Sequence, residues 1–392
     1  MWALLCFIKR SKSSSIFLPS QAFSLFTTAR HYLLLIPPTM VSFNIPIEQW
    51  AQVRQRPGGS VIYEKVPVQM PGPDEVLVNV KYSGVCHTNL HTMMAELLPK
   101  RKTPLVGGHE GTGVVVAKGE LVTDLEVGDH AGIKWLNGSC LTCTFCLQGD
   151  EQLCLQPLLS GYNVDGTFQQ YAIAKAAHIT RIPTGCSLED VCPILCTGLT
   201  VYKGLKESGV RPGQYAAIVG AGSGLGCFAL QYAKAMGIHS IAIDTGSGKS
   251  QTCTDLGAVA FIDFEKSPDI DGDIRAAVPD GLGPHAIIML ATHEELFEHA
   301  SKYVRSHGSV VYIGIQDHVH LEAPILDTAV RMVGIGGSNV GNRQDAAEAV
   351  ELFRLGLIKA PHKLIGLSQL QDVYDLTLKD EFMDRYVVDT SK

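Results

Sequence analysis

The pattern of apolar and polar residues changes near the middle of the chain. From about residue 60 to 135, short apolar segments such as EVLVNVKYSG and GTGVVVAKG are broken by glycine and proline, which is typical of half-buried β-strands. After about residue 200, strand patterns such as YAAIVG and SIAIDT alternate with helical patterns such as FALQYAKAMG. This order favours a parallel sheet covered by helices. We therefore predict an α/β chain in which a doubly wound domain follows a mostly-β domain.

The composition is that of a globular protein and argues against two classes of partner. The chain has 392 residues, which suits about two or three domains, and 46% of them are hydrophobic while 18% are charged. A net charge of −7, spread along the chain, gives no basic surface for nucleic acid. No apolar run reaches the roughly 20 residues that span a bilayer. We expect no nucleic-acid partner and no membrane partner.

The N-terminal segment differs in composition from the rest. Residues 1–47 contain no Asp or Glu but four basic residues among many serines and threonines, which is typical of a mitochondrial transit peptide. Met40 would serve equally well as an ordinary start, and residues 1–39 would then reflect a mis-set start. We expect a cytoplasmic protein, or a protein of the mitochondrial matrix if residues 1–39 are a genuine transit peptide.

Spacing among the cysteines indicates a metal site. The chain has 11 cysteines, and four of them lie close together: Cys140, Cys143, Cys146 and Cys154. Four thiolates at such short spacing can surround one tetrahedral zinc, and a closed site of this kind is structural. A ferredoxin-type iron–sulfur run places its fourth cysteine after three residues and before a proline, whereas here seven residues intervene and Leu155 follows. The spacing favours structural zinc over an iron–sulfur cluster or unligated thiols.

A glycine-rich turn joins a predicted strand to a predicted helix. Its glycines would let the backbone approach a pyrophosphate at the helix N-terminus: Gly220, Gly222, Gly224 and Gly226. Asp244 follows 18 residues after the last of these, at the end of the next strand. Its carboxylate can accept the ribose hydroxyls and would repel the 2′-phosphate of NADP. The turn therefore favours NAD, although the same glycines could serve only a tight strand-to-helix crossover.

These motifs, taken with CHTNLH at 86–91 and GGHEGTG at 107–113, closely resemble the zinc-dependent alcohol dehydrogenases of the medium-chain dehydrogenase/reductase family. The fungal fermentative type is the nearest match, from about residue 45 to the terminal RYVVDTSK. The resemblance implies a homotetramer that interconverts a primary or secondary alcohol and its aldehyde or ketone by hydride transfer to NAD. It also implies a domain order: a GroES-like catalytic domain at 40–195 with a zinc lobe at 137–157, a Rossmann NAD-binding domain at 196–337 and a return to the catalytic domain at 338–392.

The resemblance also implies a catalytic zinc, and so two zinc ions per chain. Cys86, His109 and Cys196 match the three protein ligands of the family, which leave a fourth position open for substrate. Glu110 resembles a nearby carboxylate that tunes the metal. Zinc would lower the pKa of a bound hydroxyl so that hydride transfer can follow. The Thr88 hydroxyl would pass the released proton through the cofactor ribose to His91.

Other positions match cofactor-binding residues of the family. Those that would contact the pyrophosphate or ribose are His87, Lys249 and Arg385. The turn from Ile313 to Ile315 matches the segment that lines the nicotinamide pocket.

Two positions depart from the family pattern. Asn89 stands where the family has an aspartate that accepts a hydrogen bond from the zinc-bound histidine, so we predict a weaker catalytic zinc or a slower enzyme. Leu97 stands in place of a pocket tryptophan of the ethanol-preferring type, although Trp135 is kept. We predict a substrate larger than ethanol, in specialised metabolism, unless neighbouring side chains refill the space.

Two other functions are compatible with parts of the sequence. A zinc-free enone or quinone reductase of the same family is opposed by the presence of Cys86, His109 and Cys196. An NAD-binding pseudoenzyme, suggested only by Asn89, is opposed by the intact Thr88 and His91.

Overall fold

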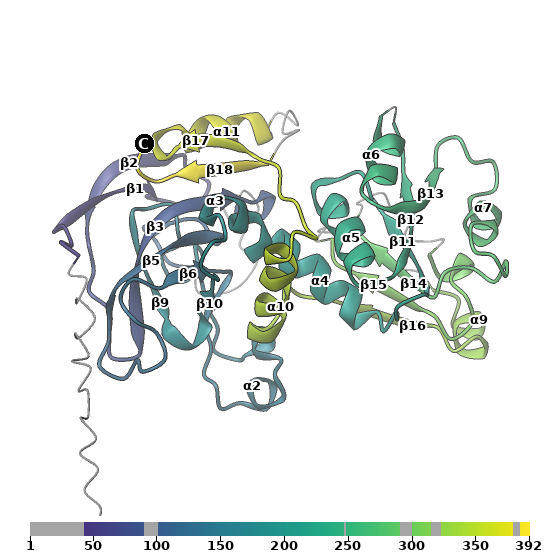
Figure 1. The fold of residues 1–392 in the computed structure, drawn as a ribbon, viewed down its shortest axis with the longest axis horizontal. Coiled ribbons are helices and arrows are strands. Elements are labelled where there is room, and N and C mark those ends of the chain that lie inside the picture. Colours follow the sequence, from purple (N-terminus) through teal and green to yellow (C-terminus); the bar gives the residue numbers. More distant parts are fainter. Residues whose placement is uncertain (1–42, 90–100, 247, 291–299, 315–322, 379–384) are drawn as a thin grey trace, which may run out of the picture. The chain divides into compact units, whose positions relative to one another are not determined.

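A computed structural model of the chain describes residues 43–89, 101–246, 248–290, 300–314, 323–378 and 385–392 (Figure 1). The segment 1–39, for which a transit peptide or a mis-set start is expected, lies outside these residues. Within the described part of the chain, no helix combines the length and the apolar character that crossing a bilayer requires.

The first part of the chain forms two sheets in which most neighbouring strands are antiparallel, while the C-terminal strands β17 and β18 pair in parallel, and this confirms the predicted mostly-β texture. The larger sheet has the order β10-β6-β5-β3-β18-β17, with β9 also paired to β3, and a smaller sheet has the order β2-β1-β4. The bounds are β1 (Glu48–Arg54), β2 (Val61–Pro67), β3 (Glu75–Val85), β4 (Leu105–Val106), β5 (Gly111–Lys118), β6 (His130–Ile133), β9 (Tyr171–Lys175), β10 (Thr180–Arg181), β17 (Lys363–Gly366) and β18 (Tyr386–Asp389). The C-terminal strands thus return to the first sheet, where Tyr386 of β18 lies opposite Val85 of β3.

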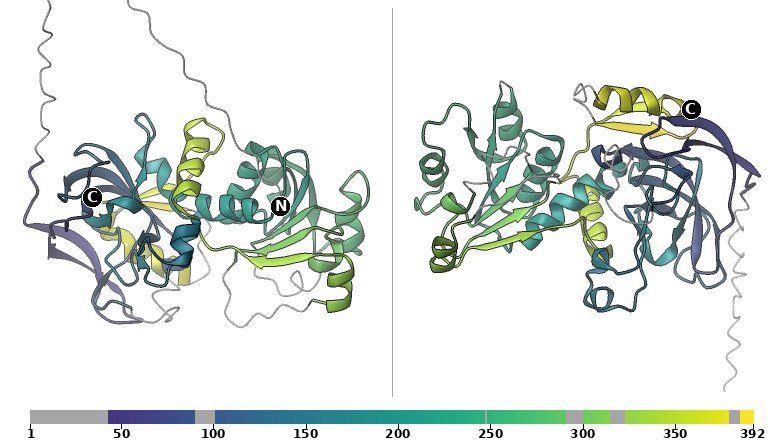
Figure 2. Two further views of the ribbon diagram at one scale, coloured as in Figure 1. Left: turned by 90° about the horizontal axis from the view of Figure 1, so that it is seen from below. Right: turned by 180° about the vertical axis from the view of Figure 1, so that it is seen from behind.

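The second large sheet is parallel throughout, with the order β13-β12-β11-β14-β15-β16. Counted within this sheet, that is the order 3-2-1-4-5-6 of the Rossmann fold, and it confirms the predicted doubly wound domain. The bounds are β11 (Tyr215–Val219), β12 (His239–Asp244), β13 (Ala258–Asp263), β14 (Ala286–Met289), β15 (Ser309–Tyr312) and β16 (Gly334–Gly337). Figure 2 shows this sheet from two further sides.

Each face of the parallel sheet has its own apolar core. Successive side chains of a strand point to opposite faces. Ile218 of β11 accordingly packs in a cluster with Phe228 of α5, whereas its neighbour Val219 packs in a second cluster with Ile274 of α7. Burying one such aliphatic side chain contributes about 1.5–3 kcal/mol. The sheet is therefore held by helices on both sides, and the ends of its strands stay available for a ligand.

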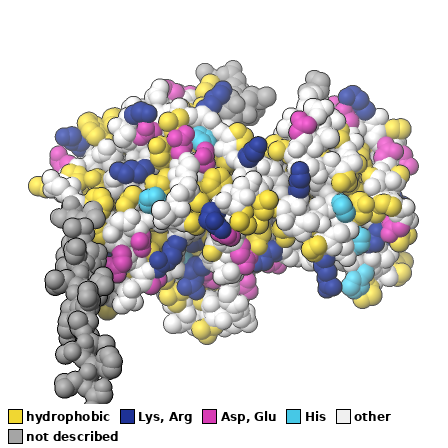
Figure 3. Space-filling model, in the orientation of Figure 1, with side chains coloured by type: hydrophobic (Ala, Val, Ile, Leu, Met, Phe, Trp, Pro, Cys, Tyr) yellow, Lys and Arg dark blue, Asp and Glu magenta, His cyan; other side chains and the backbone are white. Residues whose placement is uncertain are grey.

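Helices and short elements connect these strands. They are α2 (Thr144–Gln148), η1 (Glu151–Leu153), η2 (Ala176–His178), α3 (Leu188–Val191), η3 (Cys192–Leu195), α4 (Thr197–Glu207), α5 (Gly224–Ala235), α6 (Lys249–Asp255), α7 (Ile270–Ala276), α9 (Ile325–Val330), α10 (Arg343–Arg354), η4 (Leu367–Gln369) and α11 (Leu370–Leu378). A two-stranded sheet of β7 (Leu136–Gly138) and β8 (Leu158–Leu159) flanks the cysteine-rich segment. On the face drawn in Figure 3, acidic and basic side chains are interspersed.

Candidate active site

Four side chains from three distant segments meet in one cluster. The ligand atoms of Cys86, His109, Glu110 and Cys196 all lie within 4.8 Å of one another. Cys86 follows β3, His109 and Glu110 lie between β4 and β5, and Cys196 immediately precedes α4. The two sulfur atoms are 3.8 Å apart although 110 residues separate them. The three ligands expected from the resemblance are thus neighbours in space.

Glycines make the close approach possible. Gly108 has a φ of +93°, and a Cβ there would lie 2.7 Å from the Thr167 hydroxyl oxygen, so the turn that delivers His109 requires glycine. A Cβ at Gly84 would lie 2.0 Å from Oε2 of Glu110. Gly84 therefore leaves the space that the Glu110 carboxylate occupies.

The cysteines of the cluster lie at helix N-termini. Cys196 is the N-cap of α4, and the residues after Cys86, 87–89, are helical. The positive end of a helix favours a thiolate. The hydrogen bond that the two thiols share lowers the pKa of Cys86 and raises the pKa of Cys196, because only one of them can ionise easily beside the other. A divalent cation would hold both as thiolates.

The surroundings of Glu110 show whether the cluster suits a metal ion. The residue is fully buried, and among the described residues no N–H or O–H group donates a hydrogen bond to either carboxylate oxygen. Burial, and then the charge of Cys86, raise the pKa of Glu110 to about 7. A buried carboxylate without donors is costly unless a cation balances it. Two thiols, one imidazole and this carboxylate are a suitable donor set for zinc.

Asn89 is buried beside this cluster. Its Oδ1 accepts a hydrogen bond from the backbone N–H of Cys86 at 2.8 Å, and its Nδ2 lies 3.2 Å from Nδ1 of His109. The residue that departs from the family pattern thus touches two of the expected ligands.

The four clustered cysteines also meet around a common point. The sulfur atoms of Cys140, Cys143, Cys146 and Cys154 lie within 4.8 Å of one another. Backbone N–H groups donate to them, as from Cys143 to the Cys140 sulfur at 3.3 Å. Such amides lower the pKa of Cys140 to about 6. Four neighbouring sulfur atoms that accept hydrogen bonds from backbone N–H groups suit a tetrahedral zinc.

The glycine turn lies between β11 and α5. Gly220 has a φ of +83°, and a Cβ at Gly226 would lie 2.3 Å from the carbonyl oxygens of Gly220 and Ala221. Ser223 caps α5, because its hydroxyl accepts the N–H of Gly226 at 3.0 Å. Gly222 and Gly224 complete the turn. The turn thus presents backbone N–H groups at a helix N-terminus, where a pyrophosphate binds.

Charged side chains surround the glycine turn. Asp244, at the end of β12, accepts the N–H of Gly222 at 2.7 Å and pairs with Lys249 at 2.7 Å. Arg385 donates to the Thr197 hydroxyl at 2.9 Å and to the Gly224 carbonyl at 3.4 Å. Three of the residues expected to bind ribose or pyrophosphate, Asp244, Lys249 and Arg385, are therefore grouped around the turn.

The remaining predicted residues differ in burial, and some of them lie outside the described part of the chain. His87 is exposed, Thr88 is half-buried, and Trp135 packs edge-on against His109 with the ring centroids 5.2 Å apart. Ile313 is buried, and its side chain fills the space over Gly204. Three predicted residues lie outside the described part of the chain: His91, Leu97 and Ile315.

Sequence reasoning missed three residues of the site: Gly84, Thr197 and Ser223. Gly84 had a signal, because glycine inside a strand pattern marks a close approach. Ser223 had one too, since a serine just before a helical pattern is typical of an N-cap. Thr197, which binds Arg385, had none.

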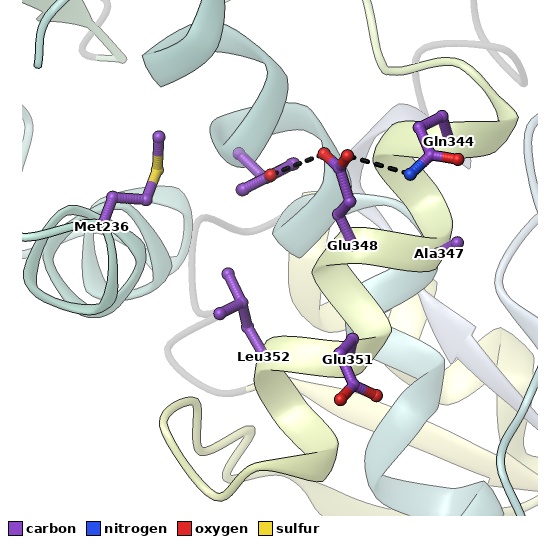
Figure 4. A pocket seen from close by; sticks show the side chains of 7 residues that line it. Met236, Gln344, Ala347, Glu348, Glu351 and Leu352 are labelled. Atoms are coloured by element: carbon purple, nitrogen blue, oxygen red, sulfur yellow. Dashed lines mark hydrogen bonds between the residues drawn. The ribbon is translucent and has the colours of Figure 1, made fainter.

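A separate hollow lies between α4, α5 and α10 (Figure 4). Glu348 is its central polar group, and it already accepts hydrogen bonds from the Tyr202 hydroxyl at 2.7 Å and the Gln344 amide at 2.9 Å. None of the predicted site residues lines this hollow, which we do not assign to the active site.

Known proteins resemble the chain in sequence and fold. Residues 72–184 match the model of the alcohol dehydrogenase GroES-like domain, and residues 224–354 match that of the zinc-binding dehydrogenases. Alcohol dehydrogenase 1 of Neurospora crassa is 62% identical over 90% of this chain and 100% of the relative. Alcohol dehydrogenase 1 of Emericella nidulans is 56% identical over 88% and 99%. The structure of acetophenone reductase from Geotrichum candidum in complex with NAD superimposes with a TM-score of 0.76 at 27% identity, over 89% of this chain and 99% of that one.

Proposed function

We propose, because the chain belongs to the zinc-dependent alcohol dehydrogenases of the medium-chain family, that it interconverts an alcohol and its aldehyde or ketone with NAD as the hydride carrier. The observation that carries this proposal is the cluster in which Cys86, His109 and Cys196 can ligate a zinc and leave one position open, with the buried carboxylate of Glu110 beside them.

Different residues of the chain would bind the metal and move the proton. Cys86, His109 and Cys196 would hold the zinc, which when bound supplies Lewis acidity that lowers the pKa of an alcohol hydroxyl. Burial keeps water from the reacting atoms. Thr88, next to His87 and two residues after Cys86, would take the proton, and His91 would carry it outward because imidazole titrates near neutral pH. The role of His91 rests on the family resemblance.

The proposed reaction is tested with a panel of primary alcohols. Because Leu97 replaces a larger tryptophan, we expect kcat/KM to be higher for hexanol and benzyl alcohol than for ethanol, and Leu97→Trp should reverse this order. The measurement is NADH absorbance, with zinc counted per chain. Two zinc ions are proposed, the second at the four-cysteine cluster.

The outcomes of this panel separate the alternatives. No NADH from any alcohol would favour an NAD-binding pseudoenzyme. One zinc per chain together with enone reduction would favour a zinc-free reductase. Ethanol as the best substrate would contradict the enlarged pocket only.

Asp244 is proposed to select NAD over NADP. Asp244→Asn removes the charge but keeps an oxygen for the N–H of Gly222, so the turn should persist. We expect the ratio of kcat/KM for NAD to that for NADP to fall about 10 to 100-fold, the value of one charge-assisted hydrogen bond. Asp263→Asn is the matched control, since Asp263 lies opposite Asp244 at the end of β13. An unchanged ratio in Asp244→Asn would contradict this role.

A homotetramer is proposed from family membership, and the surface supports self-association. Among the described strands, β16 has a neighbour on one side only. Just before it in the chain, α9 exposes Ile325, Leu326 and Val330 at 85%, 78% and 75%. An unpaired edge beside apolar side chains is typical of an interface. A monomeric mass in solution would contradict the proposal.

A cytoplasmic location is proposed, with the mitochondrial matrix as the alternative. N-terminal sequencing of the natural protein decides between them, because a start at Met40 supports the first, and a cleavage site within the basic N-terminal segment supports the second.

A further inference from the structure

Asn89 is held between two of the residues proposed to bind the catalytic zinc. It is only 4% exposed, and its side chain contacts the backbone N–H of Cys86 through Oδ1 and the Nδ1 atom of His109 through Nδ2. Its amide therefore faces a permanent donor on one side and a titratable ring on the other.

The orientation of this amide is fixed by local backbone structure. Cys86 precedes the helical residues 87–89, and the N–H of Asn89 donates to the Cys86 carbonyl at 2.9 Å. A polar side chain three residues into a helix commonly accepts the N–H of the residue that precedes the first turn. The oxygen of Asn89 fills this capping role at 2.8 Å, so its NH₂ group points to His109.

An amide cannot accept hydrogen bonds from both the Cys86 N–H and a protonated Nδ1 of His109, as a carboxylate can. It has one acceptor oxygen, whereas a carboxylate has two. With the oxygen on Cys86, the NH₂ group donates to Nδ1 of His109, and a neutral ring then carries its own proton on Nε2. Nε2 is the atom left for the metal, and a metal needs its lone pair. Turning the amide round would instead place the NH₂ group against the N–H of Cys86.

We propose that Asn89 is a positioning residue that loosens the catalytic metal centre by holding His109 in the tautomer protonated at its ligand nitrogen. Zinc must then displace that proton and reverse the tautomer, whereas the four-cysteine cluster contains no histidine whose tautomer has to change. The catalytic centre consequently fills at a higher free zinc concentration than the structural one, and activity follows the zinc supply. This inference rests on the proposed function.

The test compares the full chain with Asn89→Asp, each equilibrated with chelator-buffered zinc. Aspartate accepts both N–H groups, so the second zinc should bind at about 10 to 100-fold lower free zinc. The first zinc, at the four cysteines, should bind equally in both. Asn79→Asp is the matched control: it adds the same charge on β3, where Lys81 can pair with it, and should leave both midpoints unchanged.

A second readout reports the protonation of the His109 ring directly. ¹⁵N NMR of the chain carrying only the first zinc should show His109 protonated at Nε2, and at Nδ1 in Asn89→Asp. A wild-type ring protonated at Nδ1, equal midpoints, or an equal shift in Asn79→Asp would each overturn the proposal. A chain with both centres filled that oxidises no alcohol would refute the proposed function and leave the zinc result standing.

Discussion

Cys196→Ala is expected to lower kcat/KM for alcohol oxidation by about 10³-fold or more while leaving NAD binding intact. The change removes one of three proposed protein ligands and leaves Cys86 and His109, which cannot hold a zinc with one open position. Lewis acidity contributes several kcal/mol to such a reaction, and each 1.36 kcal/mol corresponds to a factor of ten. Steady-state kinetics, NADH binding and zinc content measure the three parts of the prediction.

Cys192→Ala is the matched control for this experiment. Cys192 is a fully buried thiol four residues earlier, in η3, and it contacts the Thr112 hydroxyl at 3.2 Å instead of the metal cluster. We expect it to lose some stability and to keep its turnover and its zinc. If Cys196→Ala retained more than a tenth of the activity, or if Cys192→Ala lost as much, the ligand assignment would be wrong.

Cys146→Ser should release one zinc per chain and unfold the segment around the four cysteines. The Cys146 sulfur lies 3.6 Å from the Cys143 sulfur and 3.9 Å from the Cys140 sulfur. Because metal binding and folding are coupled in such sites, we expect the free energy of unfolding to fall by more than about 4 kcal/mol. Urea unfolding and limited proteolysis at residues 137–157 report the loss.

A buried thiol elsewhere in the chain provides the control for that loss. Cys253 in α6 is fully buried and belongs to the apolar core, and Cys253→Ser makes the same atomic change without touching a metal. A destabilisation equal to that of Cys146→Ser, with the zinc content unchanged in each variant, would show that Cys146 is not a ligand of a structural zinc.

The structural cluster was predictable from spacing, whereas the catalytic cluster was not. Cys140 and Cys154 are separated by only 14 residues, so a short loop brings them together whatever the rest of the chain does. Cys86 and Cys196 meet only because β3, the turn after β4 and the start of α4 are placed by long-range packing. No periodicity along the sequence encodes such a meeting, and the family resemblance was needed to predict it.

The fold itself followed more directly from the sequence. Apolar strand patterns alternating with helical ones predicted the parallel sheet, because each strand must be buried on both faces. The hydrogen bonds of Asp244 were harder to predict from the sequence. The sequence indicated a ribose ligand, but the carboxylate also accepts the N–H of Gly222 and pairs with Lys249, which depends on the distance between strand end and turn.

The pairing of β18 with β3 bears on when the enzyme can become active during its synthesis. Tyr386 lies opposite Val85, which was made about 300 residues earlier, and the preceding residue, Arg385, donates to the Thr197 hydroxyl next to Cys196. The nascent chain therefore completes the pairing of β18 with β3 only after residues 386–389 have left the ribosome. Binding of the cofactor should accordingly wait for Arg385, which contacts Thr197 and Gly224, and a truncation before Arg385 should yield a chain that folds in part and binds NAD poorly.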